Sequence, residues 1–480
     1  MVKEIDAETR DVWDFVTEVH VARFFEGLDL IIRCNFVEHG LERVTLERRV
    51  IHALEFAVDP QHGRIAGGHV QVGRFLFKHQ IEKCIYFGHK FLSGAQLKLE
   101  PRQKLKMPPL NELIRREIAV TGVLPFSRFM ELALYCPNYG YYQAKRDNPG
   151  RRGDFFTSVS VGELFGQLLA FQFAEWLDPE VGSRKSEARI IEAGAHDGTL
   201  AADILNWLQN SRPGLFEQIR YCLIEPSANR QRWQKEKLEK FGSHVFWHTG
   251  FEGLKLQTQK SKTAGIIFSN ELLDAMPLHR FGWDAAEKQW FEWGVSVEGG
   301  RFIWARMAES CHVSSLICRV PRELESVLPH GYTVEASPAA ENWWRQAADS
   351  LECGRLMTMD YGLTAEDLFS PNRRRGTLRA YFRHHLADDI LANAGEQDLT
   401  AHVNFQTIQA AGESAGLKTE KFSTQSKFLT EILGRAMKDK SFGDWTRSRT
   451  RQFQTLTHPE HLGRSFRVLI QSKNLPEVHN

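Results

Sequence analysis

The strongest constraint on the fold of this chain is the stretch Ala188–Leu205, which has the sequence ARIIEAGAHDGTLAADIL. Ile190 and Ile191 supply the β-branched apolar run of a buried parallel strand, and helical spacing of apolar residues follows the turn. Gly194 and Gly198 lie between strand and helix, where glycine adopts positive φ freely and lets a ligand approach the backbone. The helix N-terminus presents unpaired N–H groups, so the pattern predicts a strand–turn–helix unit that binds a ligand.

The acidic residues near strand ends indicate which ligand this is. The dinucleotide fingerprint is G-x-G-x-x-G, whereas here Gly194 and Gly198 are four apart and Glu192 precedes them. A carboxylate disfavours a pyrophosphate but suits S-adenosylmethionine, which carries a sulfonium and an ammonium. Glu225 ends the next predicted strand, where a carboxylate binds ribose hydroxyls, and Asn270 ends a third. The alternative is a strand–helix turn that binds no ligand. The glycine turn, Glu225 and Asn270 follow one another at successive strand ends, which weakens that alternative.

The cofactor-binding residues that we expect are Glu192, Gly194, His196, Gly198, Thr199, Glu225 and Asn270, together with the hydroxyls of Thr157 and Ser158.

Ordered sequence blocks outside the turn identify a family. They include GDFFTS at Gly153–Ser158, SNELLDAMP at Ser269–Pro277, DYG at Asp360–Gly362, GTLRAY at Gly376–Tyr381 and DLTAHVNF at Asp398–Phe405. The chain resembles the MidA family of S-adenosylmethionine-dependent methyltransferases over most of its length. That family includes a mitochondrial complex I assembly factor that methylates an arginine of a core subunit. The resemblance therefore implies a protein arginine methyltransferase in a respiratory or assembly context.

One position departs from the family pattern. The family turn usually has a proline and a glycine between the outer glycines, whereas this chain has Ala195 and His196. A histidine there could crowd the methionine part of the cofactor, point away from it, or donate a hydrogen bond to its carboxylate. We expect cofactor binding to be retained.

Asn270, Glu271 and Asp274 are the candidate catalytic residues. A helix that begins after Asn270 would place Glu271 and Asp274 three residues apart on one face. Two carboxylates beside a methyl donor suit a guanidinium, which offers five N–H donors in a planar fork. The alternative is an ordinary helix start, with Asn270 as N-cap and acidic residues favoured by the helix dipole. The family resemblance favours a role at the substrate or cofactor, and Asp360 is expected to support the site indirectly.

Composition excludes several other classes of protein. Lys and Arg number 61 against 60 Asp and Glu, so no global field recruits nucleic acid. No run of apolar residues is long enough to suggest a membrane span. The seven cysteines contain no C-x-x-C pair, which favours reduced structural thiols, and no metal site is expected. The acidic, polar N-terminus predicts a bacterial-type cytoplasmic protein, with the mitochondrial matrix as the alternative.

We expect an α/β fold of the class I methyltransferase type, which is a Rossmann-like doubly wound sheet with a helical N-terminal region and an inserted α+β substrate cap. The predicted strands of the sheet lie near residues 189–193, 221–225, 244–247, 265–269 and 356–360, and 417–422 and 466–470 close it. The predicted antiparallel insertion strands are 278–280, 289–297 and 301–305. The expected domains are an extension of unknown role at 1–106, a helical region at 107–186 and a methyltransferase core at 187–475, with insertions at about 278–345 and 363–430. The extension is either an extra domain or upstream sequence joined by a misplaced start, with Met107 as the natural beginning.

The predicted function is S-adenosylmethionine-dependent methylation of a protein arginine, with the oligomeric state left open and a dimer among the options. Two alternatives stay in view: a small-molecule methyltransferase, and a non-catalytic assembly chaperone with a degenerate turn at His196. Cofactor binding would separate the chaperone from both enzymes. Mapping of methyl groups on cellular proteins would separate the two enzymes.

Overall fold

The computed structural model describes residues 109–144, 157–181, 188–256, 263–308, 320, 325–370, 373–382, 385–439 and 442–475. All of them belong to a compact unit that spans Lys106–Asn480. The extension 1–106 and the first four residues of the GDFFTS block lie outside the described residues, so the role predicted for the extension stays a prediction.

The helices are α4 (Leu110–Thr121), α5 (Phe126–Tyr135), α6 (Tyr141–Ala144), η1 (Val159–Val161), α7 (Leu164–Val181), α8 (Thr199–Ser211), α9 (Pro213–Phe216), α10 (Ala228–Leu238), η2 (Glu239–His244), α11 (Phe251–Leu256), α14 (Pro338–Ser350), α15 (Ala365–Leu368), α16 (Phe405–Ser414), α17 (Gln425–Ala436) and α18 (Arg447–Thr457). The strands are β1 (Leu124–Pro125), β2 (Ala188–Ala193), β3 (Ile219–Ile224), β4 (Val245–His248), β5 (Thr263–Asn270), β6 (His279–Asp284), β7 (Gln289–Glu298), β8 (Arg301–Arg306), β9 (Thr333–Ala336), β10 (Leu351–Leu363), β11 (Arg379–Phe382), β12 (His385–Leu386), β13 (Asp398–Thr400), β14 (Val403–Asn404), β15 (Lys418–Thr424) and β16 (Phe466–Lys473).

An eight-stranded sheet forms the core of the unit. Its order is β15-β16-β10-β5-β2-β3-β4, and β14 pairs with β10 off this path. Strands β10, β5, β2, β3 and β4 are parallel, whereas β16 is antiparallel to both of its neighbours. The chain order reverses between β2 and β5, and open α/β sheets bind ligands at such a switch point. The sheet confirms the predicted class I methyltransferase fold.

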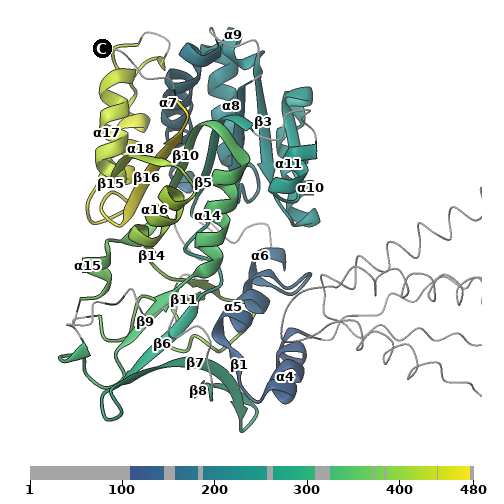
Figure 1. Ribbon diagram of the computed structural model, residues 1–480. Coiled ribbons are helices and arrows are strands. Elements are labelled where there is room, and N and C mark those ends of the chain that lie inside the picture. The colour runs from purple at the N-terminus through teal and green to yellow at the C-terminus, as the bar shows by residue number, and fades with distance from the viewer. Residues whose placement is uncertain are drawn as a thin grey trace, which may run out of the picture. The chain divides into compact units, whose positions relative to one another are not determined.

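Helices cover both faces of this sheet, as Figure 1 shows. Ile190 and Ile191 are adjacent in β2 and fully buried, but they pack into different core clusters because successive strand residues face opposite ways. Helices α7, α8 and α17 contribute to the cluster around Ile190, and α14 and α16 to the cluster around Ile191. The continuous apolar runs of the strands follow from this two-sided burial.

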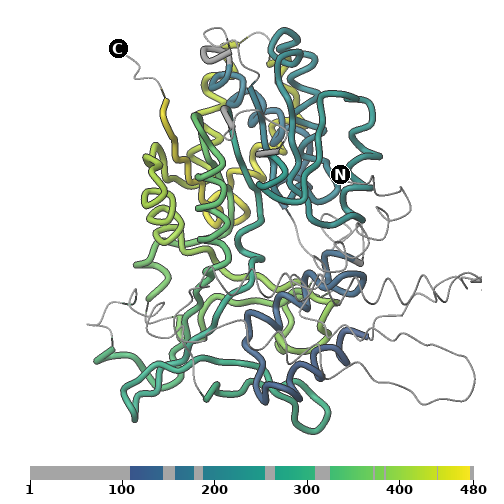
Figure 2. The backbone as a smooth tube through the Cα atoms, turned by 45° about the vertical axis from the view of Figure 1, so that its right-hand side comes forward, coloured from purple at the N-terminus to yellow at the C-terminus, as the bar shows by residue number. Residues whose placement is uncertain are grey.

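A second sheet forms the cap. It has the order β1-β7-β6-β9 with β8 paired to β7, and β12-β11-β13 makes a smaller sheet. Helices α4 and α5 contact the larger cap sheet, and Figure 2 shows the blue N-terminal helices beside the green cap strands. Phe126 of α5 packs on Trp304 of β8, with ring centroids 4.9 Å apart.

The structure corrects the predicted insertion bounds. The insertion expected at about 363–430 is shorter, because β14, α16 and β15 belong to the core sheet or pack on it. The insertion expected at about 278–345 ends near Ala336, since α14 packs against α16 and β10. All ten predicted strands are present, with ends that differ by a few residues, most at β10. Within the described residues, no helix is both long and apolar enough to cross a bilayer.

Candidate cofactor and substrate site

The glycine turn after β2 has three left-handed residues. Gly194 has φ 77°, His196 φ 46° and Gly198 φ 85°. The positive φ favours glycine at Gly194, where a Cβ atom would also lie 2.9 Å from Leu272 Cδ1 and push that side chain aside. His196 adopts a conformation that suits glycine, at a cost of order 1 kcal/mol or more. Burial lowers the pKa of His196, which keeps its ring neutral.

Side chains within the protein brace this turn. Gln234 Nε2 donates to the His196 carbonyl at 2.9 Å. Asp197 accepts hydrogen bonds from the Thr199 N–H at 3.0 Å and from the Thr199 hydroxyl at 2.7 Å. Lys237 also bonds Asp197. The Thr199 hydroxyl is therefore engaged within the protein at the start of α8.

Two buried carboxylates flank the turn. The Tyr221 hydroxyl donates to Glu192 at 2.6 Å, and burial raises the pKa of Glu192 to about 8. Glu225 follows β3 and accepts the Ser227 N–H at 2.9 Å. Burial also raises the pKa of Glu225, while Arg230 lies 3.8 Å from its carboxylate. Buried carboxylates of raised pKa stabilise a ligand that brings positive charge or hydroxyl donors.

Asn270 ends β5 with one oxygen unused. Its Nδ2 donates to Glu271 Oε1 at 3.1 Å, but its Oδ1 is buried without a hydrogen-bond partner among the described residues. Such an acceptor is costly unless a donor reaches it. The ammonium of S-adenosylmethionine is a suitable donor, so the acceptor at Asn270, the bare cradle at Gly194 and the two carboxylates fit that cofactor.

Thr157 and Ser158 have hydroxyls that are already bonded inside the protein. The N–H of Ser160, which lies in η1, donates to Thr157 Oγ1 at 3.1 Å, and the Ser158 hydroxyl donates to Gln425 Oε1 at 3.2 Å. The Ser158 N–H donates to Glu271 Oε1 at 3.1 Å. Ser158 therefore supports the site through Glu271, whereas the Thr157 hydroxyl is engaged by Ser160.

The segment after Asn270 is not a helix, which corrects the prediction that Glu271 and Asp274 share a helical face. Glu271 has φ 52°. The N–H groups of Leu272 and Leu273 donate to Asp360 Oδ2 at 3.1 and 2.8 Å. A carboxylate from β10 thus holds the loop in an irregular conformation.

The carboxylates still come together, in what we call the acidic cluster: Glu271, Asp274, Asp360 and Asp398. Asp274 is hydrogen-bonded to Asp360 and interacts electrostatically with the other two. The Tyr142 hydroxyl, from α6, donates to Asp398 Oδ1 at 2.7 Å. The members therefore come from the loop after β5, the strand β10 and the start of β13.

Burial governs the charge of the acidic cluster. It raises the pKa of Glu271 to about 8 and that of Asp360 to about 7. The pKa of Asp274 is raised well above its usual range by burial and by the neighbouring carboxylates. None of the ion pairs found among the described residues includes Glu271, Asp274 or Asp360. The cluster thus retains protons near neutral pH.

Comparison with known proteins shows to which family the protein with this site belongs. Residues 168–423 match the family described as S-adenosyl-L-methionine-dependent methyltransferases, which is more than half of the chain. The chain belongs to this family. A crystal structure of a COG1565 superfamily member from Burkholderia thailandensis, bound to S-adenosyl-homocysteine, is 30% identical with a TM-score of 0.65, covering 77% of this chain and 92% of that one.

The curated relatives carry a more specific name. The Drosophila melanogaster protein arginine methyltransferase NDUFAF7 homolog, mitochondrial, is 25% identical over 77% of this chain and 86% of its own length. The human protein arginine methyltransferase NDUFAF7, mitochondrial, is 27% identical over 80% of this chain and 86% of its own. The expected cytoplasmic location receives no support from these mitochondrial relatives.

S-adenosylmethionine is thus the cofactor of this methyltransferase. Glu192, Glu225 and Asn270 lie at or next to the ends of the neighbouring strands β2, β3 and β5, as their order in the sequence predicts. Sequence reasoning missed two members of the site, Asp398 and Tyr142. Asp398 begins the DLTAHVNF block, but nothing local in the sequence links it to Tyr142, which lies 256 positions earlier.

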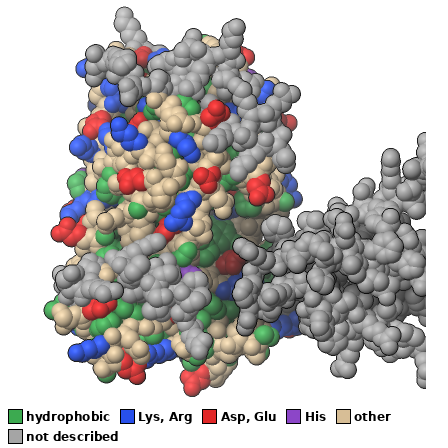
Figure 3. All heavy atoms as spheres, viewed as in Figure 1, with side chains coloured by type: hydrophobic (Ala, Val, Ile, Leu, Met, Phe, Trp, Pro, Cys, Tyr) green, Lys and Arg blue, Asp and Glu red, His purple; other side chains and the backbone are tan. Residues whose placement is uncertain are grey.

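Acidic and basic side chains are intermixed over the face of the methyltransferase in Figure 3. This face shows no broad basic patch of the kind that binds nucleic acid.

Proposed function

We propose that this methyltransferase transfers a methyl group from S-adenosylmethionine to the guanidinium of an arginine in a protein. The observation that supports the proposal is the acidic cluster, where Glu271, Asp274 and Asp360 are gathered beside Asn270 without an ion-pair partner in the described structure. The names of the curated relatives agree with this substrate.

The charge and shape of the cluster favour arginine over other nucleophiles. Arginine stays protonated at neutral pH and presents five N–H donors in one plane. Several carboxylate oxygens around one point accept such a fork in a bidentate manner, whereas a lysine ammonium is a compact point charge. The Tyr135 and Tyr142 rings lie 5.7 Å apart near the cluster and keep this part of the site partly apolar.

Each residue then has a proposed role in the reaction. The bound cofactor supplies an electrophilic methyl group on its sulfonium. The turn from Gly194 to Gly198, together with Glu192 and Asn270, binds and orients that cofactor. Glu271 and Asp274 accept N–H bonds from the guanidinium and align one nitrogen with the methyl carbon, which is catalysis by positioning.

The proton lost from nitrogen needs an acceptor. A guanidinium nitrogen becomes nucleophilic only as it loses that proton, and we assign its acceptance to an ionised carboxylate oxygen of Asp274. Asp274 suits this role because burial and the neighbouring carboxylates raise its pKa, so its ionised form binds a proton more tightly than an ordinary aspartate does.

Methylarginine mapping tests the proposal in cells. We expect at least one methylarginine site to disappear from the proteome of a strain without this gene. A gene with Glu271→Gln should fail to restore it, whereas Glu366→Gln, an exposed change on α15, should restore it. Loss of a methylated metabolite with all methylarginine unchanged would instead favour a small-molecule methyltransferase. Failure of the purified protein to bind S-adenosylmethionine would favour the chaperone.

The MidA resemblance implies a subunit of a respiratory complex as the protein substrate. We propose the mitochondrial matrix, or the corresponding bacterial compartment, as the place of action. The same mapping tests this, because the lost methylarginine should fall in a respiratory subunit.

A further inference from the structure

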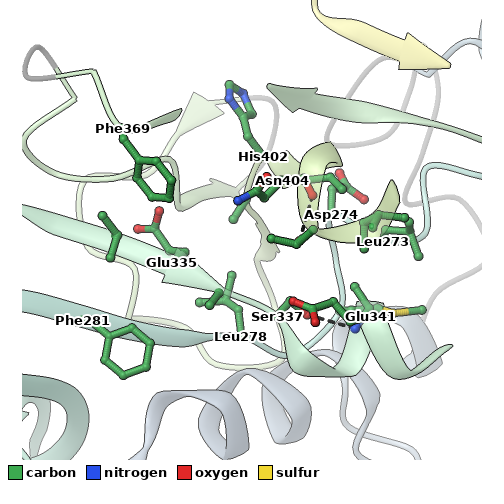
Figure 4. Close-up of a pocket in the computed structure, with 18 of the residues that line it drawn as sticks. Leu273, Asp274, Leu278, Phe281, Glu335, Ser337, Glu341, Phe369, His402 and Asn404 are labelled. Atoms are coloured by element: carbon green, nitrogen blue, oxygen red, sulfur yellow. Dashed lines mark hydrogen bonds between the residues drawn. The ribbon is translucent and has the colours of Figure 1, made fainter. Parts of the chain in front are cut away.

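A pocket lies beside the acidic cluster on the side of the cap (Figure 4). The loop after β5 contributes Leu273 and Leu278 to its wall, and the cap contributes Phe281 and Val334. Phe369 completes the apolar lining in Figure 4, and Asp274 lies at the opposite end from it. Asp274 therefore belongs both to the acidic cluster and to this pocket.

Several polar side chains of the pocket are already engaged within the protein. Glu335 Oε2 accepts the Thr377 N–H at 2.8 Å. The Ser337 hydroxyl donates to the Pro277 carbonyl at 2.9 Å, and Glu341 pairs with Arg345 at 3.2 Å. What the pocket offers to a ligand is thus mainly apolar surface.

Two polar atoms of the pocket are exceptions. Glu335 Oε1 makes no hydrogen bond, although Arg280 lies 3.6 Å away and offsets its charge. His402 Nδ1 is buried without a partner among the described residues, and burial lowers the pKa of His402 to about 4. A neutral ring nitrogen of this kind can bond one amide of a bound chain.

We propose that this pocket binds an apolar side chain one or two residues from the target arginine of the protein substrate. The inference rests on the proposed arginine methylation. In an extended chain residues advance by about 3.3 Å, so a residue two places away starts about 7 Å from the arginine. Asp274 holds the arginine on the side of the acidic cluster. The side chain of a residue one or two places away then reaches the pocket, which lies on the other side of Asp274.

Pairs of peptides test this directly. Each pair contains one arginine and differs only in having leucine or glycine at one position within two residues of it. We expect the leucine peptide to exceed the glycine peptide in kcat/KM by about tenfold or more at one of these positions, since a pocket that fits extra apolar groups discriminates by that much.

Variants assign the preference to the pocket. Ala340→Leu fills it from α14, whereas Ala339→Leu makes the same change one residue earlier, outside the lining. The leucine-to-glycine ratio should fall toward one in the first variant and stay unchanged in the second. Because it is a ratio measured on one enzyme sample, it does not depend on the fraction that is folded. Phe369→Ala, which enlarges the pocket, should shift the preference from leucine toward tryptophan.

The outcomes separate the two proposals. Methylation of arginine peptides with ratios near one at every position, or with a ratio that survives Ala340→Leu, would overturn the pocket assignment and leave arginine methylation standing. Absence of methyl transfer to every arginine peptide, with S-adenosylmethionine bound, would overturn the proposed function and this inference with it.

Discussion

Single residues in the acidic cluster lower the stability of the folded protein, because carboxyl groups are buried together where we propose that a cation binds. A buried carboxylate costs free energy when it ionises, and neighbouring carboxylates add to that cost. For Glu271 and Asp274 both effects act together. Groups that destabilise the free protein in this way are typical of functional sites.

Asp274→Asn should therefore change stability and activity in opposite directions. The asparagine keeps the shape and can donate to Asp360, but it cannot ionise. We expect a higher melting temperature than that of the unchanged protein at pH 8, with methyl transfer lowered about tenfold to a hundredfold by the loss of a charge-assisted bond worth about 1.5–3 kcal/mol. Calorimetry and a transfer assay on the same samples measure both. A lower melting temperature, with turnover per folded molecule unchanged, would mean that Asp274 is structural.

The cluster also sets a pH dependence. The pKa values of Glu271 and Asp360 are higher in the folded protein than in the unfolded chain. Protonation of these groups therefore stabilises the folded protein fully below about pH 4, and this stabilisation is lost as the pH rises toward 7 to 8. Binding of an arginine needs the ionised forms. We expect kcat/KM for an arginine peptide, at saturating S-adenosylmethionine, to rise between pH 6 and about 8 while thermal stability falls. A flat kcat/KM profile over this range would contradict the role of the cluster.

At the scale of elements, the loop after β5 shows what local sequence could not predict. Asn270, Glu271 and Asp274 have the spacing of a capped helix start. The structure instead satisfies the loop N–H groups with Asp360, which lies 87 residues beyond Leu273. Local pattern cannot reveal a partner so far along the chain, so the sequence indicated Asn270, Glu271 and Asp274 as candidates but not the conformation in which the loop holds them.

Asp360→Asn tests this positioning role. One amide oxygen cannot replace both carboxylate oxygens, which accept the Leu272, Leu273 and Tyr361 N–H groups. We expect kcat/KM for the arginine peptide to fall at least tenfold, with the affinity for S-adenosylmethionine within a few-fold of normal. Asp349→Asn, an exposed change on α14, is the control. Equal losses in cofactor affinity and transfer would indicate general unfolding rather than a displaced loop.

The glycine turn makes an independent prediction. Gly198→Val should abolish S-adenosylmethionine binding, because a β-branched residue resists φ 85° and its side chain would press on Gln234 and Leu238, which displaces the turn. Gly214→Ala is a matched control, since its Cβ would meet nothing within 4 Å. Isothermal titration of both variants measures the effect. Normal binding by Gly198→Val would place the cofactor elsewhere.

At the scale of the whole molecule, the core was more predictable than the cap. The strands β2, β3 and β5 are buried on both faces, so each shows a continuous apolar run that marks it in the sequence. The end of the second insertion was not predictable, because the sequences of β14 and α16 would look the same whether these elements packed on the core sheet or on a cap. The helical N-terminal region likewise divides, since α4 and α5 contact the cap sheet while α7 packs on α8 and α17.

The most direct test of the central claim is the identity of the atom that receives the methyl group. Purified protein, labelled S-adenosylmethionine and peptides that differ only in carrying arginine, lysine or citrulline at one position would be analysed by tandem mass spectrometry. We predict methyl groups on the arginine nitrogens, none on lysine or on the neutral citrulline, and at least a tenfold loss with Glu271→Gln at unchanged cofactor affinity. Methylation of lysine or citrulline at a comparable rate, or an arginine rate unaffected by Glu271→Gln, would contradict the account.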